Sequence, residues 1–179
     1  RCSYCMPAEI FGPDFAFLPR AELLTFEEIA LVAHELVALG ARTLRITGGE
    51  PLVRRDLEQL VALLRALDVN EALSGEPLDI ALTTNGSLLA KLAAPLRAAG
   101  LNRITVSLDS LNPATFTRMS GSALPLESVL EGIAAATAAG FTNIKLNAVI
   151  RRGVNDADVP ALAAFAREGG HTLRLIEYM

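Results

Sequence analysis

Hydrophobic and polar positions along the chain follow two periods that alternate from one segment to the next. Residues 25–40 carry apolar side chains at helical spacing, start with a Thr25–Glu28 capping box and stop at Gly40, which predicts an α-helix. Further helices are predicted at 56–67 with Asp56 as its cap, at 87–100 with an interruption at Pro95, at 126–140 and at 156–170. Strands are predicted between them, at 42–47, 78–84, 103–108, 142–150 and 172–178.

The order of these elements predicts the fold class. Strands joined by helices must run parallel, because a parallel neighbour is reached only through a crossover connection. The pattern therefore indicates an α/β fold, either an open doubly wound sheet or part of a (β/α) barrel. A complete barrel needs more strands, so we expect the loop around Cys2 and Cys5 to follow a strand upstream of this chain, which we interpret as a fragment. Residues 69–77 are predicted to form a surface loop, and residues 1–179 a single domain.

Each predicted strand has an apolar face and a polar face. The apolar face comprises Leu44, Ile46, Ile80, Leu82, Ile104, Val106, Ile144, Leu146, Leu173 and Leu175. The polar face comprises Thr43, Arg45, Thr47, Asp79, Thr83, Arg103, Thr105, Ser107, Lys145, Asn147, Thr172 and Arg174. A parallel strand buried on both sides would be apolar on both faces. We therefore expect the polar face to line a binding lumen; a polar network that merely fills a small barrel is the alternative.

Composition and charge narrow the classes of partner. The chain has 51% hydrophobic and 20% charged residues, which is typical of a globular protein, and it has no apolar run long enough to cross a membrane. A net charge of -4 argues against a nucleic-acid surface. Lys91 and Lys145 are the only lysines among 16 basic residues; the others are arginines, which suit bidentate phosphate contacts.

Ligands of parallel α/β folds bind at the carboxyl ends of the strands, so the residues that follow each predicted strand are candidate ligand-binding residues. Gly48, Gly49 and Glu50 follow one strand; the glycines would let backbone approach a ligand, and Glu50 would accept hydrogen bonds from an ammonium group. A tight strand-to-helix turn is the alternative for the glycines. Cys2 and Cys5 have three interpretations: half of a zinc site, a redox dithiol or part of an iron-sulfur site. For the zinc site, neither His34 nor His171 has a partner at zinc-ligand spacing.

These motifs together resemble a known family. Radical S-adenosylmethionine (SAM) enzymes carry a CxxxCxxC loop, whose last two cysteines resemble RCSYCMP, and a GGEP segment, which resembles RITGGEPLVRRDL. Within that superfamily the chain is similar to the GTP-cyclising enzymes of molybdenum cofactor biosynthesis through LTTNG, RITVSLDSLNP, IKLNAVIRRGVND and RLIEYM. The resemblance covers essentially the whole chain. It implies a partial parallel (β/α) barrel of the radical SAM type, truncated at both ends.

The resemblance also implies roles for individual residues. Cys2 and Cys5 would be ligands of a 4Fe–4S cluster whose remaining cysteine lies upstream. The residues that would contact S-adenosylmethionine are Tyr4, Gly48, Gly49, Glu50, Ser107 and Met179. The residues that would bind GTP are Arg45, Thr83, Lys145 and Arg174, all of which fall on the polar strand face. No side chain of the chain is expected to act as a catalytic acid or base.

The implied reaction is a radical cyclisation. Cleavage of S-adenosylmethionine would give a radical that removes the 3′ hydrogen of GTP, and the sugar would then bond to C8 of guanine. A second 4Fe–4S cluster is expected in a C-terminal region beyond this chain, so we expect the chain alone to be inactive. An electron donor, a possible homodimer and a cytoplasmic location are also expected, without nucleic-acid or membrane partners. A peptide-modifying radical SAM enzyme and a non-catalytic zinc module remain the alternatives.

Overall fold

A parallel sheet forms the centre of the protein. The computed structural model describes residues 4–5, 10–12, 14–67, 76–122 and 124–178. The described strands are β1 (Thr43–Ile46), β2 (Asp79–Thr84), β3 (Arg103–Ser107), β4 (Lys145–Ile150) and β5 (Thr172–Glu177). They form one sheet in the order β1-β2-β3-β4-β5, and every neighbouring pair is parallel. A doubly wound sheet reverses its strand order at a switch point, whereas this order runs in one direction, as it does in a barrel. The predicted fold class, a partial (β/α) barrel, is therefore confirmed.

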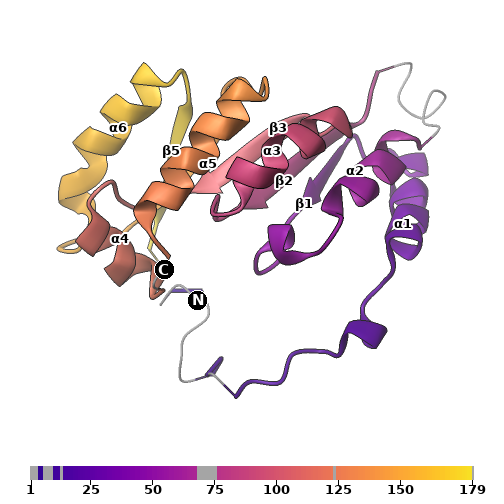
Figure 1. Cartoon of the computed structure of the whole chain (residues 1–179), viewed down its shortest axis with the longest axis horizontal. Helices are drawn as coiled ribbons and strands as arrows, with labels where there is room; N and C mark the ends of the chain where they lie inside the picture. Colours follow the sequence, from indigo (N-terminus) through magenta and orange to yellow (C-terminus); the bar gives the residue numbers. More distant parts are fainter. Residues whose placement is uncertain (1–3, 6–9, 13, 68–75, 123, 179) are drawn as a thin grey trace.

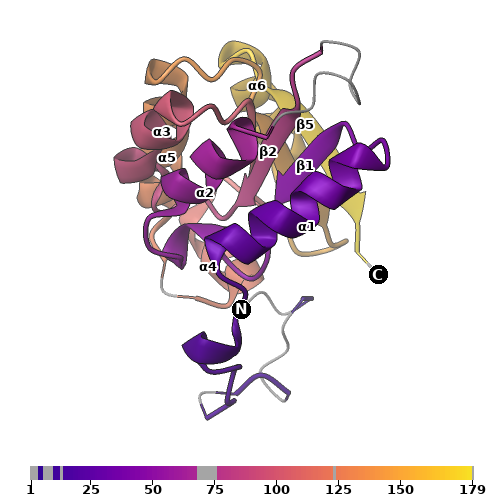
Figure 2. The same ribbon diagram turned by 90° about the vertical axis from the view of Figure 1, so that its right-hand side faces the viewer.

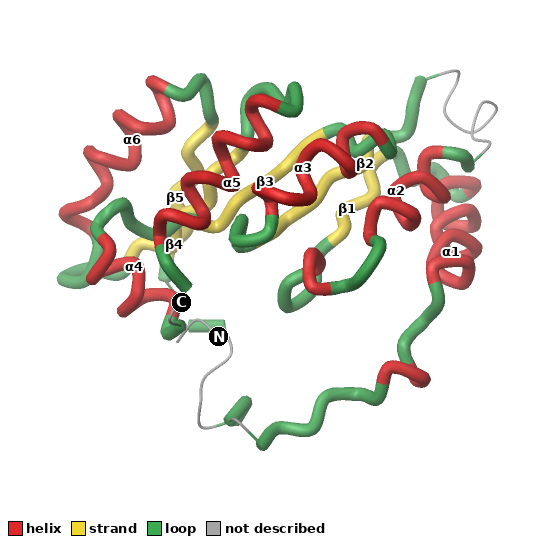
Figure 3. The backbone as a smooth tube through the Cα atoms, in the orientation of Figure 1, coloured by secondary structure: helices red, strands yellow, loops and turns green. Residues whose placement is uncertain are grey.

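The helices lie on one side of this sheet (Figures 1, 2 and 3). They are α1 (Phe26–Ala38), α2 (Leu57–Arg65), α3 (Leu89–Ala98), α4 (Pro113–Ser120), α5 (Leu126–Ala138) and α6 (Val159–Glu168). Short 3₁₀ turns occur at Arg20–Glu22, Pro51–Val53 and Asp156–Asp158. No helix within the described residues is long and apolar enough to cross a bilayer.

The hydrophobic core lies between the helices and the predicted apolar strand face. Ile80, Leu82, Val106 and Leu146 in the central strands have no exposed surface. Leu175 differs from the prediction because it is 53% exposed. It lies on β5, which is an edge strand of the described sheet, so its side chain has neighbours on one flank only.

Helix ends agree with the sequence in some places and differ in others. Thr25 caps α1 as predicted, since the Glu28 amide donates to Thr25 Oγ1 over 3.2 Å and the Thr25 amide donates to Glu28 Oε2 over 2.7 Å. Asp56 does occupy the cap position of α2, but it adopts φ 59° and its side chain makes no capping bond. Asp56 is therefore the cap residue, as predicted, but it contributes no side-chain hydrogen bond to the helix end.

Two further differences concern α3 and α4. Pro95 lies inside α3 and does not interrupt it. Buried Leu89, Ala93 and Leu96 hold the helix against the core on both sides of the proline, and this packing outweighs the missing amide hydrogen bond. The sequence analysis missed α4, although Asn112 caps it and Gly121 ends it, both of which are recognisable signals.

Helices α3 and α5 pack against each other (Figure 1), and Gly132 of α5 allows their close approach. A Cβ atom at Gly132 would lie 2.3 Å from the Gly86 carbonyl oxygen and 3.0 Å from Leu89 Cβ. We expect Gly132→Ala to lower the free energy of unfolding by about 1–3 kcal/mol, because the two helices must separate. Urea unfolding of the full-length protein measures this. Ala134→Ser on the exposed side of α5 is the control, and an equal loss from both variants would contradict the packing argument.

Candidate functional site

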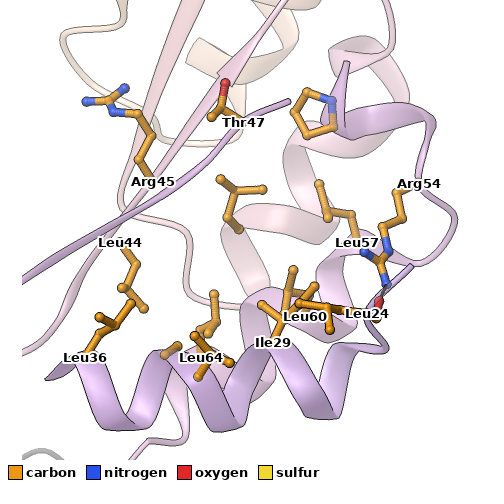
Figure 4. Close-up of a pocket in the computed structure, with 14 residues that line it drawn as sticks. Leu24, Ile29, Leu36, Leu44, Arg45, Thr47, Arg54, Leu57, Leu60 and Leu64 are labelled. Carbon is orange, nitrogen blue, oxygen red and sulfur yellow. Dashed lines mark hydrogen bonds between the residues drawn. The ribbon is translucent and has the colours of Figure 1, made fainter. Parts of the chain in front are cut away.

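The polar strand face brings predicted site residues from separate strands together. Arg45 Nη1 donates to Thr83 Oγ1 over 2.9 Å and to Thr105 Oγ1 over 3.4 Å. Thr105 in turn lies beside Lys145 in the parallel register of β3 and β4. Figure 4 shows Arg45 and Thr47 pointing away from the helix that Leu44 faces, as strand alternation requires. Arg45, Thr83 and Lys145 therefore share one surface.

A second row of polar residues lies nearer the carboxyl ends of the strands. Ser107 pairs in register with Asn147, and Asn147 pairs with Arg174. The side-chain oxygen of Asn147 is buried and has no hydrogen-bond partner among the described residues. Buried polar atoms are normally paired, so this oxygen is available to a donor on a bound ligand.

Arg103 also belongs to the polar face, but an acidic neighbour neutralises it. Its Nε donates to Asp79 Oδ1 over 2.9 Å, its Nη2 donates to Asp79 Oδ2, and Thr43 Oγ1 donates to the same Oδ2 over 3.2 Å. The hydrogen bond from Arg103 lowers the pKa of Asp79 below its ordinary value of 3.8, against the opposing effect of burial. The same pairing raises the pKa of Arg103. The ion pair lies at the amino-terminal ends of β2 and β3.

This ion pair predicts a pH-dependent contribution to stability. A carboxyl group whose pKa is lowered by folding stabilises the fold above its unfolded pKa, and the contribution is lost as pH falls through the folded pKa. Asp79→Asn should therefore cost up to about 1 kcal/mol at pH 7, and the difference from the wild type should vanish only at a pH below the lowered pKa of folded Asp79, which itself lies below 3.8. Urea unfolding at both pH values tests this, with Glu76→Gln as control because Glu76 and Arg42 form an exposed pair 3.9 Å apart. An equal cost at both pH values would contradict the assignment.

The Gly48-Gly49-Glu50 loop ends β1. Gly48 has φ 153°, which favours glycine, and a Cβ built on Gly48 or Gly49 would meet nothing within 4 Å. The open space suits a ligand that approaches the backbone. Glu50, in contrast, is already engaged: Oε1 accepts from Thr84 Oγ1 over 2.7 Å and from the Leu52 amide over 3.0 Å, while Oε2 accepts from the Asn85 amide over 2.6 Å. Its carboxylate therefore ties this loop to the end of β2, a role that the sequence analysis did not predict.

Tyr4 lies against residues that follow β3 and β5. Tyr4 is half-buried, and its hydroxyl donates to Asp109 Oδ2 over 2.7 Å, while Cys5 is exposed with a free thiol. Cys2 and Met179 lie outside the described residues. Among the described residues no three His, Cys, Asp or Glu side chains gather as metal ligands, and His34 is instead exposed on α1 beside Glu35. These residues thus supply no partners with which Cys5 could form the alternative zinc site.

A buried polar network supports the cysteine loop, and sequence reasoning did not single out its members. Asp109 is 6% exposed, and Asn155 is fully buried. Burial raises the pKa of Asp109, although the hydrogen bonds from Tyr4 and the Val149 amide oppose this shift. The signal that could have found them is their position in the segments SLDS and GVND, which lie in the connections that follow β3 and β4.

An apolar cavity of about 360 Å³ lies between α1, α2 and β1 (Figure 4). Its walls include Ile29, Leu44, Leu57, Leu60 and Leu64. Figure 4 shows that these aliphatic side chains converge from the helices and from the apolar face of β1. The cavity is therefore largely a continuation of the core, although Arg45 and Thr47 of β1 are also among its lining residues.

Solved structures share the fold of this chain. The chain matches the crystal structure of HydG, a maturase of the FeFe-hydrogenase, with a TM-score of 0.73 and 15% identity over 99% of this chain and 39% of that one. It matches methylornithine synthase (PylB) with a TM-score of 0.62 and 18% identity over 100% of this chain and 50% of that one. At these identities the likeness establishes the fold alone.

Curated relatives are more similar in sequence. The chain is 63% identical over its full length to a GTP 3′,8-cyclase of Acidothermus cellulolyticus and 48% identical to one of Xanthomonas axonopodis pv. citri. It covers 48% and 51% of these two proteins, so it spans about half the length of the curated relatives it matches. The sequence family described as the Radical SAM superfamily matches residues 1–166. With that match over most of its length, the chain belongs to the radical SAM superfamily.

Proposed function

We propose that the full-length protein containing this chain is a GTP 3′,8-cyclase, a radical SAM lyase of molybdenum cofactor biosynthesis. The observation that carries the proposal is the 63% identity, along the whole chain, to a protein of that name. The polar sheet face adds chemical support, because Arg45, Lys145 and Arg174 form no ion pair with any described residue and their charges suit a triphosphate. The product would be a 3′,8-cyclised dihydro-GTP.

Substrate binding is assigned to the cationic residues of the polar face. Arg45, Lys145 and Arg174 lie on three different strands and face the same side of the sheet. Arginine suits bidentate contacts to phosphate oxygens, and lysine adds a point charge. Thr83 holds the Arg45 guanidinium through the 2.9 Å bond and so helps to aim it. Arg103 is left out of this set because Asp79 neutralises it.

Cofactor binding is assigned to the carboxyl ends of the strands. Cys2 and Cys5 would hold a 4Fe–4S cluster together with a cysteine of the longer protein, and exposed Cys5 with its free thiol fits that role. Gly48 and Gly49 offer open space at the backbone, and Ser107 lies beside the unpartnered Asn147 oxygen. With the Glu50 loop, Tyr4 and Met179, they would hold S-adenosylmethionine. When bound, the cluster and S-adenosylmethionine supply a radical that removes hydrogen from GTP.

The remaining partners belong to the longer protein. We propose that it takes electrons from a reduced donor, carries a second 4Fe–4S cluster outside this chain and functions in the cytoplasm. Within this chain the residues bind and orient the reactants. Helices cover the outer face of the sheet and leave the polar face turned toward the lumen, where enclosure limits the access of water to a reactive species.

An anaerobic isotope experiment tests the proposal. The full-length protein, reconstituted with iron and sulfide, is incubated with S-adenosylmethionine, a reductant and GTP deuterated at C3′. Deuterium in the 5′-deoxyadenosine that forms is the expected result. If the 5′-deoxyadenosine is unlabelled and its rate of formation does not depend on GTP, the protein is a radical SAM enzyme whose substrate is not GTP. A peptide-modifying enzyme would give this result. The absence of 5′-deoxyadenosine from protein with a complete cluster would exclude the radical reaction.

A further inference from the structure

The cysteine loop is fastened to the barrel through the side chain of Tyr4, which lies between the two cysteines. The Tyr4 hydroxyl donates to Asp109 Oδ2 over 2.7 Å, a contact between residues 105 positions apart in the sequence. The Tyr4 ring also meets the Tyr178 ring edge-on, with centroids 6.3 Å apart. Tyr4 therefore joins the loop to the segments that follow β3 and β5.

Asp109 is itself held from several directions. Its Oδ1 accepts from the Val149 amide over 2.8 Å, and its carbonyl oxygen accepts from Asn155 Nδ2 over 2.8 Å. The same Asn155 amide group donates to the Val149 carbonyl over 2.8 Å, and its Oδ1 accepts from the Arg151 amide over 2.8 Å. Both residues are buried, so the Asp109 carboxylate is fixed relative to the ends of β3 and β4 before any ligand arrives.

The position of this network relates it to the site. Asp109 follows β3 two residues after Ser107, which lies on the polar face beside Asn147. Tyr4, which is bonded to Asp109, is therefore held close to the carboxyl end of β3 on the polar face. A buried carboxylate that lost its Tyr4 donor would keep an unsatisfied oxygen, which opposes displacement of the loop.

From this arrangement we propose that Asp109 is a positioning residue for the cysteine loop. The inference rests on the proposed function, since it takes Cys2 and Cys5 as cluster ligands. Asp109, itself held by Asn155, binds the Tyr4 hydroxyl and thereby fixes Tyr4, the neighbour of Cys5 in the sequence. The Tyr4 hydroxyl donates its proton to Asp109, so it is not the donor of a hydrogen bond to S-adenosylmethionine. Partners beyond the direct ligands orient metal sites in this way, and their loss typically weakens metal binding about 10–100-fold.

The test measures how well the full-length protein retains its cluster. Wild type, Tyr4→Phe, Asp109→Ala and the double variant are reconstituted, and the first-order rate of iron loss to a ferrous chelator is measured anaerobically. Tyr4→Phe keeps the ring and removes only the hydroxyl, and we expect iron loss to be at least about 10-fold faster than in the wild type. Tyr178→Phe is the matched control: it removes the same atom from the neighbouring ring, and its hydroxyl bonds to no described residue.

Two comparisons separate positioning from general stability. In the Asp109→Ala background, Tyr4→Phe should add little, because the same contact is already lost; additive effects would overturn the proposal. The S-adenosylmethionine concentration that gives half of the change in the electron paramagnetic resonance spectrum should also rise in Tyr4→Phe. If Tyr4→Phe behaves like the wild type and Tyr178→Phe in both measurements, the positioning role of Asp109 is overturned, while the proposed function is unaffected. A wild-type protein that takes up no cluster would overturn it together with the proposed function.

Discussion

Cys5→Ser in the full-length protein is expected to lower 5′-deoxyadenosine formation at least about 100-fold, since losing a direct ligand should cost no less than losing the partners behind it. Cys5 is exposed with a free thiol, whereas a structural cysteine would be buried. A serine hydroxyl occupies nearly the same volume but is a poor ligand for iron. Acid-labile sulfide and iron per chain, measured after reconstitution, should fall together with the activity.

The matched control for Cys5→Ser is Ser87→Ala. Ser87 ends the hydrogen-bonded turn after β2, where its hydroxyl donates to Asn85 Oδ1 over 2.7 Å, and it is not one of the residues assigned to the site. This variant loses one side-chain hydrogen bond and should keep its iron and sulfide. Full cluster content in Cys5→Ser would contradict the role of Cys5 as a ligand, whatever the activity of that variant.

The polar strand face could be predicted from sequence because it follows from two simple properties of the chain. Strand neighbours point to opposite faces, and the order of the elements requires a parallel sheet. Arg45, Thr83 and Lys145 were therefore expected on one face, and the Arg45–Thr83 hydrogen bond shows two of them in direct contact. The alternation of side chains along a strand does not reveal the pairing of Arg103 with Asp79. This pairing depends on which polar residues of β2 and β3 come close to each other in the sheet.

Long-range contacts explain most of what the sequence analysis missed. Glu50 was expected to face an ammonium group, yet its carboxylate binds Thr84 and the Asn85 amide, which lie more than 30 positions away. Asp109 and Asn155 have no local pattern that marks them as buried. Nothing in the neighbouring sequence reports such contacts, because they arise only when the ends of successive parallel strands meet at one edge of the sheet.

Lys145→Met is expected to raise the KM for GTP about 10–100-fold, because a hydrogen bond to a charged group contributes roughly 1.5–3 kcal/mol. Lys145 is partly buried on β4, where it lies in register between Thr105 and Thr172, so its ammonium group is directed to the polar face. Methionine keeps the length and apolar stem of the side chain and removes its charge. Initial rates of GTP consumption by the reconstituted full-length protein measure the change.

Lys91→Met is the matched control for Lys145→Met, because Lys91 is the only other lysine of the chain and lies exposed on α3. Both substitutions make the net charge more negative by the same amount, so a general electrostatic effect would raise KM equally in both variants. An effect through the lumen would be confined to Lys145. Equal KM values for both variants and the wild type would remove Lys145 from the substrate site and leave Arg45 and Arg174 as the proposed phosphate contacts, while a rise in Lys145→Met alone would place the triphosphate against β4.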